Sequence, residues 1–389
     1  MTAVNKREQK ISTLQWAEPV DKDSVKEKLE KVVLVRLVLP EDDESKLKSD
    51  LQELALLTRT AGGVVVGTVI QKRKKPDPAY LIGEGKARFL RDLLAKTKTS
   101  TVIFDNELKP GQLRNLQRIF GDHIKILDRS ALILDIFATH ARTPEAKIQV
   151  KLAQLEYLLP RLSGMWRHLE RQYGTIGVRG PGEKQLEMDR RTIRKQISVL
   201  RQKLKKVEIE RRIQRKRRTK LFRISIVGYT NSGKTSLLNR LAGARSYVAN
   251  KLFSTLDALT RRISDGEKVA LITDTVGFIQ KIPHHLIESF KSTLAETREA
   301  DLLLIIADAS HEAVDEHIKV VNQVLDEISA PDENQRLLVM NKVDLLTPDE
   351  LSWLRRKYPT AMFVSALTGT GIDALKEYIF ARIGEKNAR

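Results

Sequence analysis

The chain has 389 residues, 41% of them hydrophobic and 31% charged, a composition typical of globular proteins with two or three domains. It contains no cysteine, which excludes disulfide scaffolds, thiol nucleophiles, iron–sulfur clusters and cysteine-ligated zinc. The longest apolar run, residues 302–307, is far shorter than the roughly 20 residues of a membrane span, and no secretory signal opens the chain. We therefore expect a cytoplasmic protein with no membrane span.

The net charge of +19 is concentrated in one segment. Residues 184–220 hold 16 Lys and Arg against 4 Asp and Glu, whereas residues 221–389 are nearly neutral. A charge run can be a solvated helix face, but such density in so short a stretch favours a polyanionic partner such as RNA.

The N-terminal third predicts a small α/β domain. Residues 1–30 show no clear period and are expected to be a poorly ordered lead-in. Residues 31–144 then alternate strand-like and helix-like segments, which favours βαβ units and a mostly parallel sheet. Strands are expected at 32–38, 64–70, 101–104 and 124–127, and helices near 47–54, 84–95 and 110–121.

Two features of this domain resemble ligand sites. Residues 83–86 (GEGK) lack the four-residue spacer and the Ser or Thr of a P-loop, so a turn before a helix is the favoured interpretation. A separate purine-nucleotide site here is kept as an alternative. Asp105 and Glu107 follow a strand, where ligand sites of α/β proteins often form, but the sequence assigns them no role.

Residues 145–220 change period. Two apolar stripes, at 148–162 and 193–207, have the spacing of an antiparallel helical hairpin, and Pro160 is expected to kink its first helix. Between the stripes, residues 174–184 (GTIGVRGPGEK) hold four glycines and a proline, which argues against regular structure. This loop is either a flexible tip or a segment that orders against RNA, and residues 211–220 form a basic linker. The candidate RNA-binding residues are Arg179, Lys184, Arg190, Arg191, Arg194 and Lys195.

The third domain, residues 221–389, carries the most specific signal. A buried-strand pattern at 222–227 is followed at once by residues 228–235 (GYTNSGKT) and a helix pattern, which is a P-loop in its required context. Backbone N–H groups and the helix N-terminus would hold phosphate, Lys234 would reach the β- and γ-phosphates, and Thr235 would bind Mg²⁺. The expected nucleotide-binding residues here are Gly228, Asn231, Ser232, Gly233, Lys234, Thr235 and Ser236.

A later motif selects guanine as the base. In residues 341–344 (NKVD), Asp344 would accept both N1–H and N2–H of guanine, a donor pair that adenine lacks. Lys342 would lie along the base, and Asn341 would tie this loop to the P-loop. The backbone N–H groups that could meet guanine O6 belong to Ser365, Ala366 and Leu367.

Residues 274–277 (DTVG) end another predicted strand and point to magnesium and the γ-phosphate. Asp274 would hold Mg²⁺ through a water, and Gly277 would donate its N–H to the γ-phosphate, whose loss would release the following loop. Residues 253–260 should contribute Phe253 to the nucleotide site and a threonine to the metal; we prefer Thr255, with Ser254 and Thr260 as alternatives. The expected catalytic residues are Lys234, Thr255 and Gly277.

These motifs together resemble a translation-factor-class (TRAFAC) GTPase domain, and three further segments resemble the HflX family of ribosome-associated GTPases. The segments are 253–257 (FSTLD), 274–279 (DTVGFI) with 283–287 (PHHLI) following, and 180–187 (GPGEKQLE). The resemblance covers about residues 31–385. It implies an N-terminal α/β domain joined by a helical hairpin to a P-loop GTPase domain.

The resemblance also implies a role on the ribosome. Members of the family bind the large ribosomal subunit and whole ribosomes, and nucleotide controls the splitting or rescue of stalled ribosomes. The basic hairpin is compatible with contact to rRNA. Some HflX-like proteins carry a further C-terminal domain, whereas this chain stops soon after a last helix at 372–383. We expect a monomer.

The residue after the DxxG glycine leaves the rate of hydrolysis open. Many GTPases place there a glutamine that orients the attacking water, but this chain has Phe278, whose ring cannot hydrogen-bond. We expect slow intrinsic turnover, with stimulation by a partner of the order of 10³–10⁵-fold, the ribosome being the first candidate. His284 and His285 lie near this loop, and a catalytic role for them is the less favoured interpretation.

Three functions therefore stay open. The favoured one is an Mg²⁺-dependent GTPase that couples GTP hydrolysis to ribosome dissociation, rescue or large-subunit handling. A ribosome-assembly GTPase would have the same chemistry. An RNA-binding module that uses guanine nucleotide as a structural ligand, with negligible turnover, is the alternative of another class.

Overall fold

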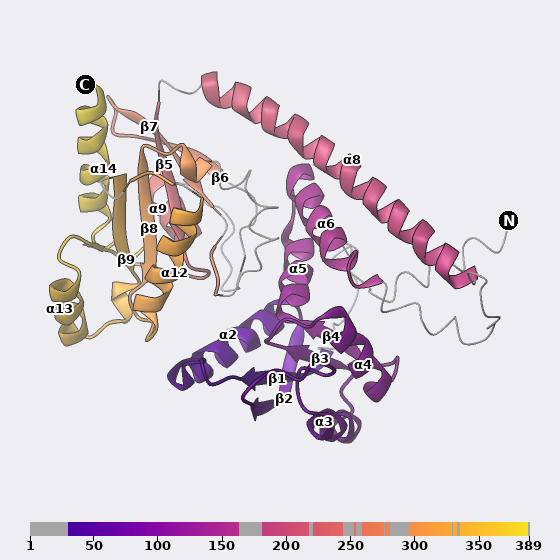
Figure 1. Cartoon of the computed structure of the whole chain (residues 1–389). Coiled ribbons are helices and arrows are strands. Elements are labelled where there is room, and N and C mark those ends of the chain that lie inside the picture. Colours follow the sequence, from indigo (N-terminus) through magenta and orange to yellow (C-terminus); the bar gives the residue numbers. More distant parts are fainter. Residues whose placement is uncertain are drawn as a thin grey trace, which may run out of the picture. The chain divides into compact units, whose positions relative to one another are not determined.

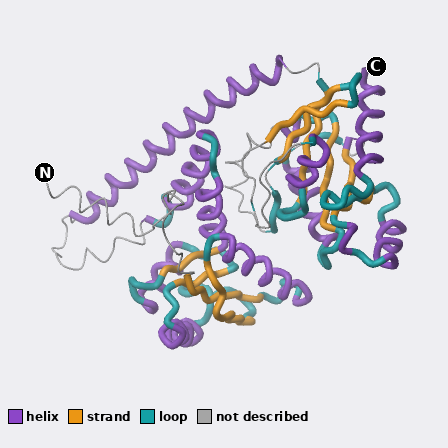
Figure 2. The backbone as a smooth tube through the Cα atoms, turned by 180° about the vertical axis from the view of Figure 1, so that it is seen from behind, coloured by secondary structure: helices purple, strands orange, loops and turns teal. Residues whose placement is uncertain are grey.

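The computed structural model describes residues 30–162, 181–217, 221–243, 253, 259–275, 277–280, 296–328, 330–332 and 335–387. The chain divides into two compact units, coloured along the sequence in Figure 1. Each unit has its own β-sheet covered by helices, as the strand and helix colouring of Figure 2 shows, which confirms the predicted α/β class. Unit 1 comprises the described residues of Met1–Thr139 and Lys147–Lys203, and unit 2 those of His140–Ala146 and Leu204–Arg389.

The sheet of unit 1 has four parallel strands in the order β2-β1-β3-β4. Parallel neighbours need crossover connections, and helices supply them here, so the predicted βαβ pattern is confirmed. The elements of this sheet and its helices are β1 (Glu30–Val38), η1 (Glu44–Lys46), α2 (Leu47–Thr60), β2 (Gly63–Lys72), α3 (Glu84–Thr97), β3 (Thr101–Phe104), α4 (Pro110–Phe120), β4 (Lys125–Asp128) and α5 (Arg129–His140).

Alternate residues of β1 fix which side of the sheet becomes the core. Val33, Val35 and Leu37 lie in one buried cluster with apolar residues of α3 and α4. Gly83 directly precedes α3 and donates its backbone N–H to the Gln71 side chain, 3.0 Å away. The GEGK segment is thus a turn that leads into a helix, as the sequence favours.

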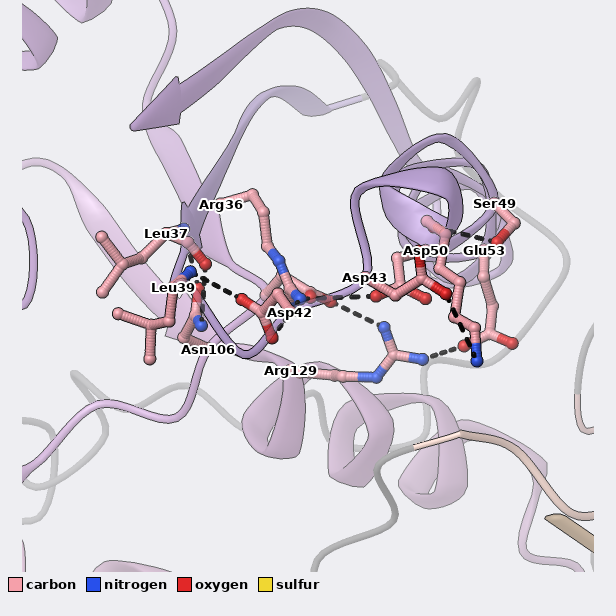
Figure 3. Close-up of polar contacts among 12 residues, drawn as sticks. Arg36, Leu37, Leu39, Asp42, Asp43, Ser49, Asp50, Glu53, Asn106 and Arg129 are labelled. Atoms are coloured by element: carbon pink, nitrogen blue, oxygen red, sulfur yellow. Dashed lines mark hydrogen bonds and ion pairs between the residues drawn. The ribbon is translucent and has the colours of Figure 1, made fainter. Parts of the chain in front are cut away.

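The carboxyl ends of β1 and β3 are occupied by a buried ion cluster, shown in Figure 3. Asp105, fully buried, accepts from the guanidinium groups of Arg36 and Arg129. Arg36 also faces Asp50 at 3.4 Å, and Arg129 pairs with Glu53 of α2. Buried carboxylates with such complete cationic partners are structural, because each charge offsets the desolvation of the other.

The predicted hairpin region forms α6 (Pro144–Leu158) and α8 (Pro181–Arg217), which run in opposite directions (Figure 1). Ile193 and Ile197 of the second apolar stripe are buried, and Arg201 pairs with Glu156 at 2.8 Å. Two details of the prediction are wrong. α6 ends at Leu158 and the chain turns at 159–161, so Pro160 follows the helix and does not kink it.

The second detail concerns the start of α8. Residues 181–184 of the predicted irregular loop are helical, because proline at the first position of a helix loses no internal hydrogen bond. α8 also extends through most of the predicted linker, as far as Arg217. Among the described residues, no helix is both long and apolar enough to cross a membrane.

Unit 2 is built on six strands in the order β10-β9-β8-β5-β7-β6, of which only β6 pairs antiparallel with its neighbour. Alternate residues of β8 face opposite sides: Leu302, Leu304 and Ile306 pack with α9 and α14, whereas Leu303 and Ile305 pack with α12. The elements are β5 (Phe222–Gly228), α9 (Lys234–Ala242), β6 (Leu259–Ser264), β7 (Val269–Asp274), β8 (Leu302–Asp308), α12 (Val314–Glu327), β9 (Arg336–Asn341), η4 (Val343–Leu345), α13 (Pro348–Lys357), β10 (Met362–Phe363) and α14 (Ile372–Asn387).

Candidate nucleotide site

The P-loop lies between β5 and α9, in the strand–loop–helix context that the motif requires. Gly228 and Gly233 cannot be replaced without a clash: a Cβ would lie 2.2 Å from the Ile306 carbonyl oxygen and 2.2 Å from the Asn341 side chain, respectively. Gly233 also has a φ of 90°, which favours glycine. The glycines therefore serve two purposes, the turn itself and close packing against β8 and β9.

Lys234 is buried at the start of α9, with its ammonium turned onto the loop. It donates to the backbone carbonyls of Tyr229 at 2.8 Å and Gly228 at 3.2 Å. Burial lowers the pKa of Lys234 to about 8, and nearby Asp274 opposes this shift. The ammonium is thus poised beside a loop whose backbone can bind phosphate.

Thr235 and Asp274 meet beneath the P-loop. The Thr235 hydroxyl donates to Asp274 Oδ2 at 2.6 Å, while the buried Oδ1 has no hydrogen-bond partner among the described residues. Burial raises the pKa of Asp274, and Lys234 and Thr235 partly offset this. A hydroxyl beside a carboxylate with an unused buried oxygen fits Mg²⁺, which typically takes one or two protein ligands and completes its shell with water and phosphate.

The segment after Asp274 is fastened to the P-loop by its backbone. Phe278 N–H donates to the Gly228 carbonyl at 3.0 Å, and Thr230 N–H donates to the Phe278 carbonyl at 2.7 Å. A Cβ on Gly277 would lie 2.9 Å from Lys234 Nζ, so this glycine lies against the lysine. The Phe278 ring is buried in the core with Val227, Leu303 and α12, and it does not line the phosphate loop.

The predicted guanine motif connects three loops. Asn341 donates from its side chain to the Ser232 carbonyl at 2.9 Å and accepts the Ala366 N–H at 3.0 Å. Lys342 has a φ of 66° and pairs with Asp308 at 2.6 Å. Asp344 is exposed, and so is Leu367. Val343 N–H donates to the Val364 carbonyl at 3.3 Å, so the NKVD turn lies beside the segment that leads into residues 365–367.

The other candidate residues differ in exposure, and some of them lie outside the described residues. Asn231 is exposed with a φ of 62°, Ser232 and Ser365 are buried, and Ser236 lies in the first turn of α9. Phe253 is buried with a φ of 54°. Ser254 and Thr255 lie outside the described residues, as do His284 and His285. Thr260 lies in β6, where its hydroxyl contacts that of Thr273 at 3.0 Å, so this alternative metal ligand already has a partner.

The candidate RNA-binding residues follow α8. Arg191, Arg194 and Lys195 are exposed and Arg190 is half-buried. Lys184 lies in the first turn of α8, with its side chain outside the described part of the structure, and Arg179 lies outside the described residues altogether.

Sequence reasoning missed two residues that shape the site. Asp308 ends strand β8 and pairs with Lys342. Tyr229, second in the P-loop, stacks on His317 of α12 with ring centroids 3.7 Å apart and an interplanar angle of 8°. A signal existed for Asp308, since polar residues at the carboxyl ends of parallel strands often serve ligand sites. The P-loop motif gives no signal for Tyr229, because the second position of the motif accepts any residue.

Three family models match the chain. Residues 48–138 match a GTP-binding GTPase N-terminal model, residues 140–218 a GTP-binding GTPase middle-region model, and residues 223–342 a 50S ribosome-binding GTPase model.

Two curated relatives that match most of the chain agree with these models. The chain is 47% identical to a GTPase HflX of Flavobacterium psychrophilum, over 81% of this chain and 76% of the relative. It is 45% identical to the GTPase HflX of Escherichia coli, over 92% of this chain and 84% of the relative. Among solved structures, a GTP-binding protein of Sulfolobus solfataricus in complex with GDP is 25% identical, with a TM-score of 0.45 and coverage of 92% and 99%.

Proposed function

This chain belongs to the HflX family of GTPases, and from that premise we propose that it couples GTP binding and hydrolysis to dissociation, rescue or large-subunit handling of ribosomes. The reaction is hydrolysis of GTP to GDP and phosphate. We propose that the chain is a cytoplasmic monomer. It would bind ribosomal RNA, with the large subunit as the favoured partner. The observation that carries the proposal is the set of contacts by which Asn341, Thr235 and Asp274 join the P-loop to its neighbouring motifs.

We assign the nucleotide contacts residue by residue. The P-loop backbone and the Lys234 ammonium bind the β- and γ-phosphates, and Asp344 accepts from the guanine edge. Thr235 would hold Mg²⁺ through its hydroxyl and Asp274 through a water, with Thr255 as the further ligand that we prefer. The metal, when bound, neutralises charge that develops on the transferred phosphoryl group. Gly277 donates its backbone N–H to the terminal phosphate.

The position of Phe278 supports slow turnover by the chain alone. Its backbone is fastened to the P-loop and its ring is committed to the core, so this residue offers the attacking water no polar group from its side chain. Positioning the water then falls to another group, and we propose that the ribosome supplies or orders it. A partner that completes a GTPase site in this way can accelerate hydrolysis by about 10³–10⁵-fold.

We assign the RNA contact to residues 145–220, with residues 174–184 and the exposed basic face of α8. Arg191, Arg194 and Lys195 are available on the described part of that face. Each phosphate contact adds about 0.7 to 0.9 to the slope of log affinity against log salt. Changing these three residues to Gln should reduce that slope by about 2, as measured by sedimentation with large subunits. An unchanged slope would place the RNA contact elsewhere.

The test of the main proposal is GTP turnover at fixed salt, alone and with purified large subunits or whole ribosomes. Sedimentation is run in parallel with GDP and with a non-hydrolysable GTP analogue. Strong stimulation, with splitting or binding that depends on the analogue, is the expected result. Lys234→Ala should abolish both effects, because the phosphates lose their charged partner.

Two outcomes would redirect the proposal. Turnover near background with ribosomes present, and binding that ignores the nucleotide, would favour the RNA-binding module, which the core position of Phe278 keeps plausible. Analogue-dependent binding to immature subunits alone would favour a ribosome-assembly GTPase.

A further inference from the structure

Tyr229 is the residue on which three segments of unit 2 meet. Its carbonyl accepts from Lys234 Nζ at 2.8 Å. Its hydroxyl accepts the backbone N–H of Gln280 at 2.9 Å, and its ring stacks on His317 of α12. One P-loop residue therefore contacts the lysine through its backbone, and contacts the segment that follows DxxG and a core helix through its side chain.

The stack gives the tyrosine ring a fixed place. Tyr229 is 4% exposed and His317 is 8% exposed. Burial and the neighbouring His311 lower the pKa of His317 to about 4, so the imidazole is neutral over the physiological range and stacks as an uncharged ring. His317 belongs to α12, whose Val321 and Val324 pack in the core, so the ring rests on a helix that is itself fixed.

The hydroxyl in turn fixes the segment 277–280. The backbone of Phe278 is paired with Gly228 and Thr230, and Gln280 is held by Tyr229. Gly277 lies immediately before these two attachments and against Lys234. Gly277 thus lies next to a fastened stretch of backbone, at the place where a terminal phosphate would contact the lysine.

We propose that Tyr229 is a positioning residue that sets the Gly277 N–H for the γ-phosphate, and so governs how strongly the site distinguishes GTP from GDP. The inference rests on the proposed contact between Gly277 and the terminal phosphate. Tyr229 acts through Gln280 and Gly277 and touches no reacting atom. GDP lacks the phosphate that Gly277 would meet, so its affinity should not depend on the position of the Gly277 N–H.

The test is the affinity of the full-length chain for fluorescent GDP and a fluorescent non-hydrolysable GTP analogue. Tyr229→Phe removes only the hydroxyl and should weaken the analogue by about 3- to 10-fold, the effect of one hydrogen bond, while GDP affinity changes by less than about twofold. The kcat for GTP should fall together with the affinity for the analogue. His317→Ala should act in the same direction, and His317→Phe, which keeps a ring to stack on, should restore discrimination.

Tyr157→Phe is the matched control, because it removes a buried tyrosine hydroxyl from unit 1, where it donates to Asp128 at 2.9 Å. It should leave both affinities unchanged. Equal losses for GDP and analogue in Tyr229→Phe, or no loss at all, would overturn the proposal and leave Tyr229 a packing residue. Lys234→Ala separates this failure from that of the site itself: affinities for GDP and for the analogue that are both unchanged by the loss of Lys234 would show that the phosphates do not contact this lysine.

Discussion

Asp105 and Asp274 are both buried at the carboxyl ends of parallel strands, but their carboxylates have different hydrogen-bond partners. Asp105 of unit 1 lies between Arg36 and Arg129, and both of its oxygens accept from guanidinium groups. Asp274 of unit 2 is held by the Thr235 hydroxyl on one oxygen, and its other oxygen has no partner in the described residues. The same position in the same kind of sheet is therefore structural where its charge is matched and available for ligand chemistry where it is not.

The largest effect should come from breaking the matched cluster. Asp105→Asn leaves two buried guanidinium groups without a full counter-charge and should lower the free energy of unfolding by about 3–5 kcal/mol. Urea denaturation measures this. Asp92→Asn is the control, since its pair with Arg91 is exposed and should contribute less than about 1 kcal/mol. A loss as small as that of the control would mean that the cluster is held together by packing.

The second aspartate should behave in the opposite way. Asp274→Asn removes the proposed metal contact and should slow GTP turnover by about 100-fold, or about 2.7 kcal/mol. Stability without nucleotide should be unchanged or higher, because burial raises the pKa of this carboxyl and an amide carries no charge to desolvate. Thermal unfolding and steady-state turnover test the two halves. A strongly destabilised variant would erase the contrast between the two aspartates.

Lys234 should make nucleotide affinity depend on pH. Its pKa is lowered to about 8, and phosphate oxygens beside the ammonium would raise it, so binding takes up a proton when the pH exceeds 8. Affinity for GDP should be flat below pH 8 and should fall by up to about tenfold between pH 8 and 9. Calorimetry in two buffers of different ionisation enthalpy measures the proton uptake directly. No uptake at pH 8.5 would show that the lysine is already charged in the free site.

The smallest effect concerns a further buried aspartate, Asp128, which ends strand β4 of unit 1. It accepts from the Tyr157 hydroxyl and faces Arg161 at 3.4 Å, so it belongs to the matched class. Tyr157→Phe should lower the free energy of unfolding by about 1 kcal/mol, the net effect of one hydrogen bond. Denaturation of this variant and of the wild type in parallel gives the value. A change in GTP turnover would contradict the assignment of unit 1 carboxylates to structure.

The sequence predicts most of the fold because its signals are local. Glycine and proline mark the ends of α4, and the alternation of strands and helices in unit 1 gives the parallel sheet. α5 escaped prediction because most of its residues are buried, so it lacks the regular polar face from which a helical period is recognised. β6 escaped because it is an edge strand in which Ile263 alone is buried, so its sequence lacks the apolar alternation that marks a strand.

The candidate site was likewise predicted only in part: motifs with fixed spacing were recognised, whereas contacts between distant residues were not. The P-loop and the NKVD motif are readable because their chemistry fixes residue types at fixed spacing. Two contacts could not be predicted from spacing. Asp308 pairs with Lys342, 34 positions away, and Tyr229 stacks on His317, 88 positions away. The sequence shows that Phe278 stands where many GTPases have a glutamine. Its burial in the core depends on tertiary packing with α12, which the sequence does not show.

The two carbonyls that hold Lys234 bear on nucleotide exchange. Whenever phosphate leaves, the buried ammonium has the Gly228 and Tyr229 carbonyls as replacement acceptors, so release does not strand an unpaired charge. These substitute acceptors lower the free-energy cost of removing phosphate from the lysine, and so favour release of GDP.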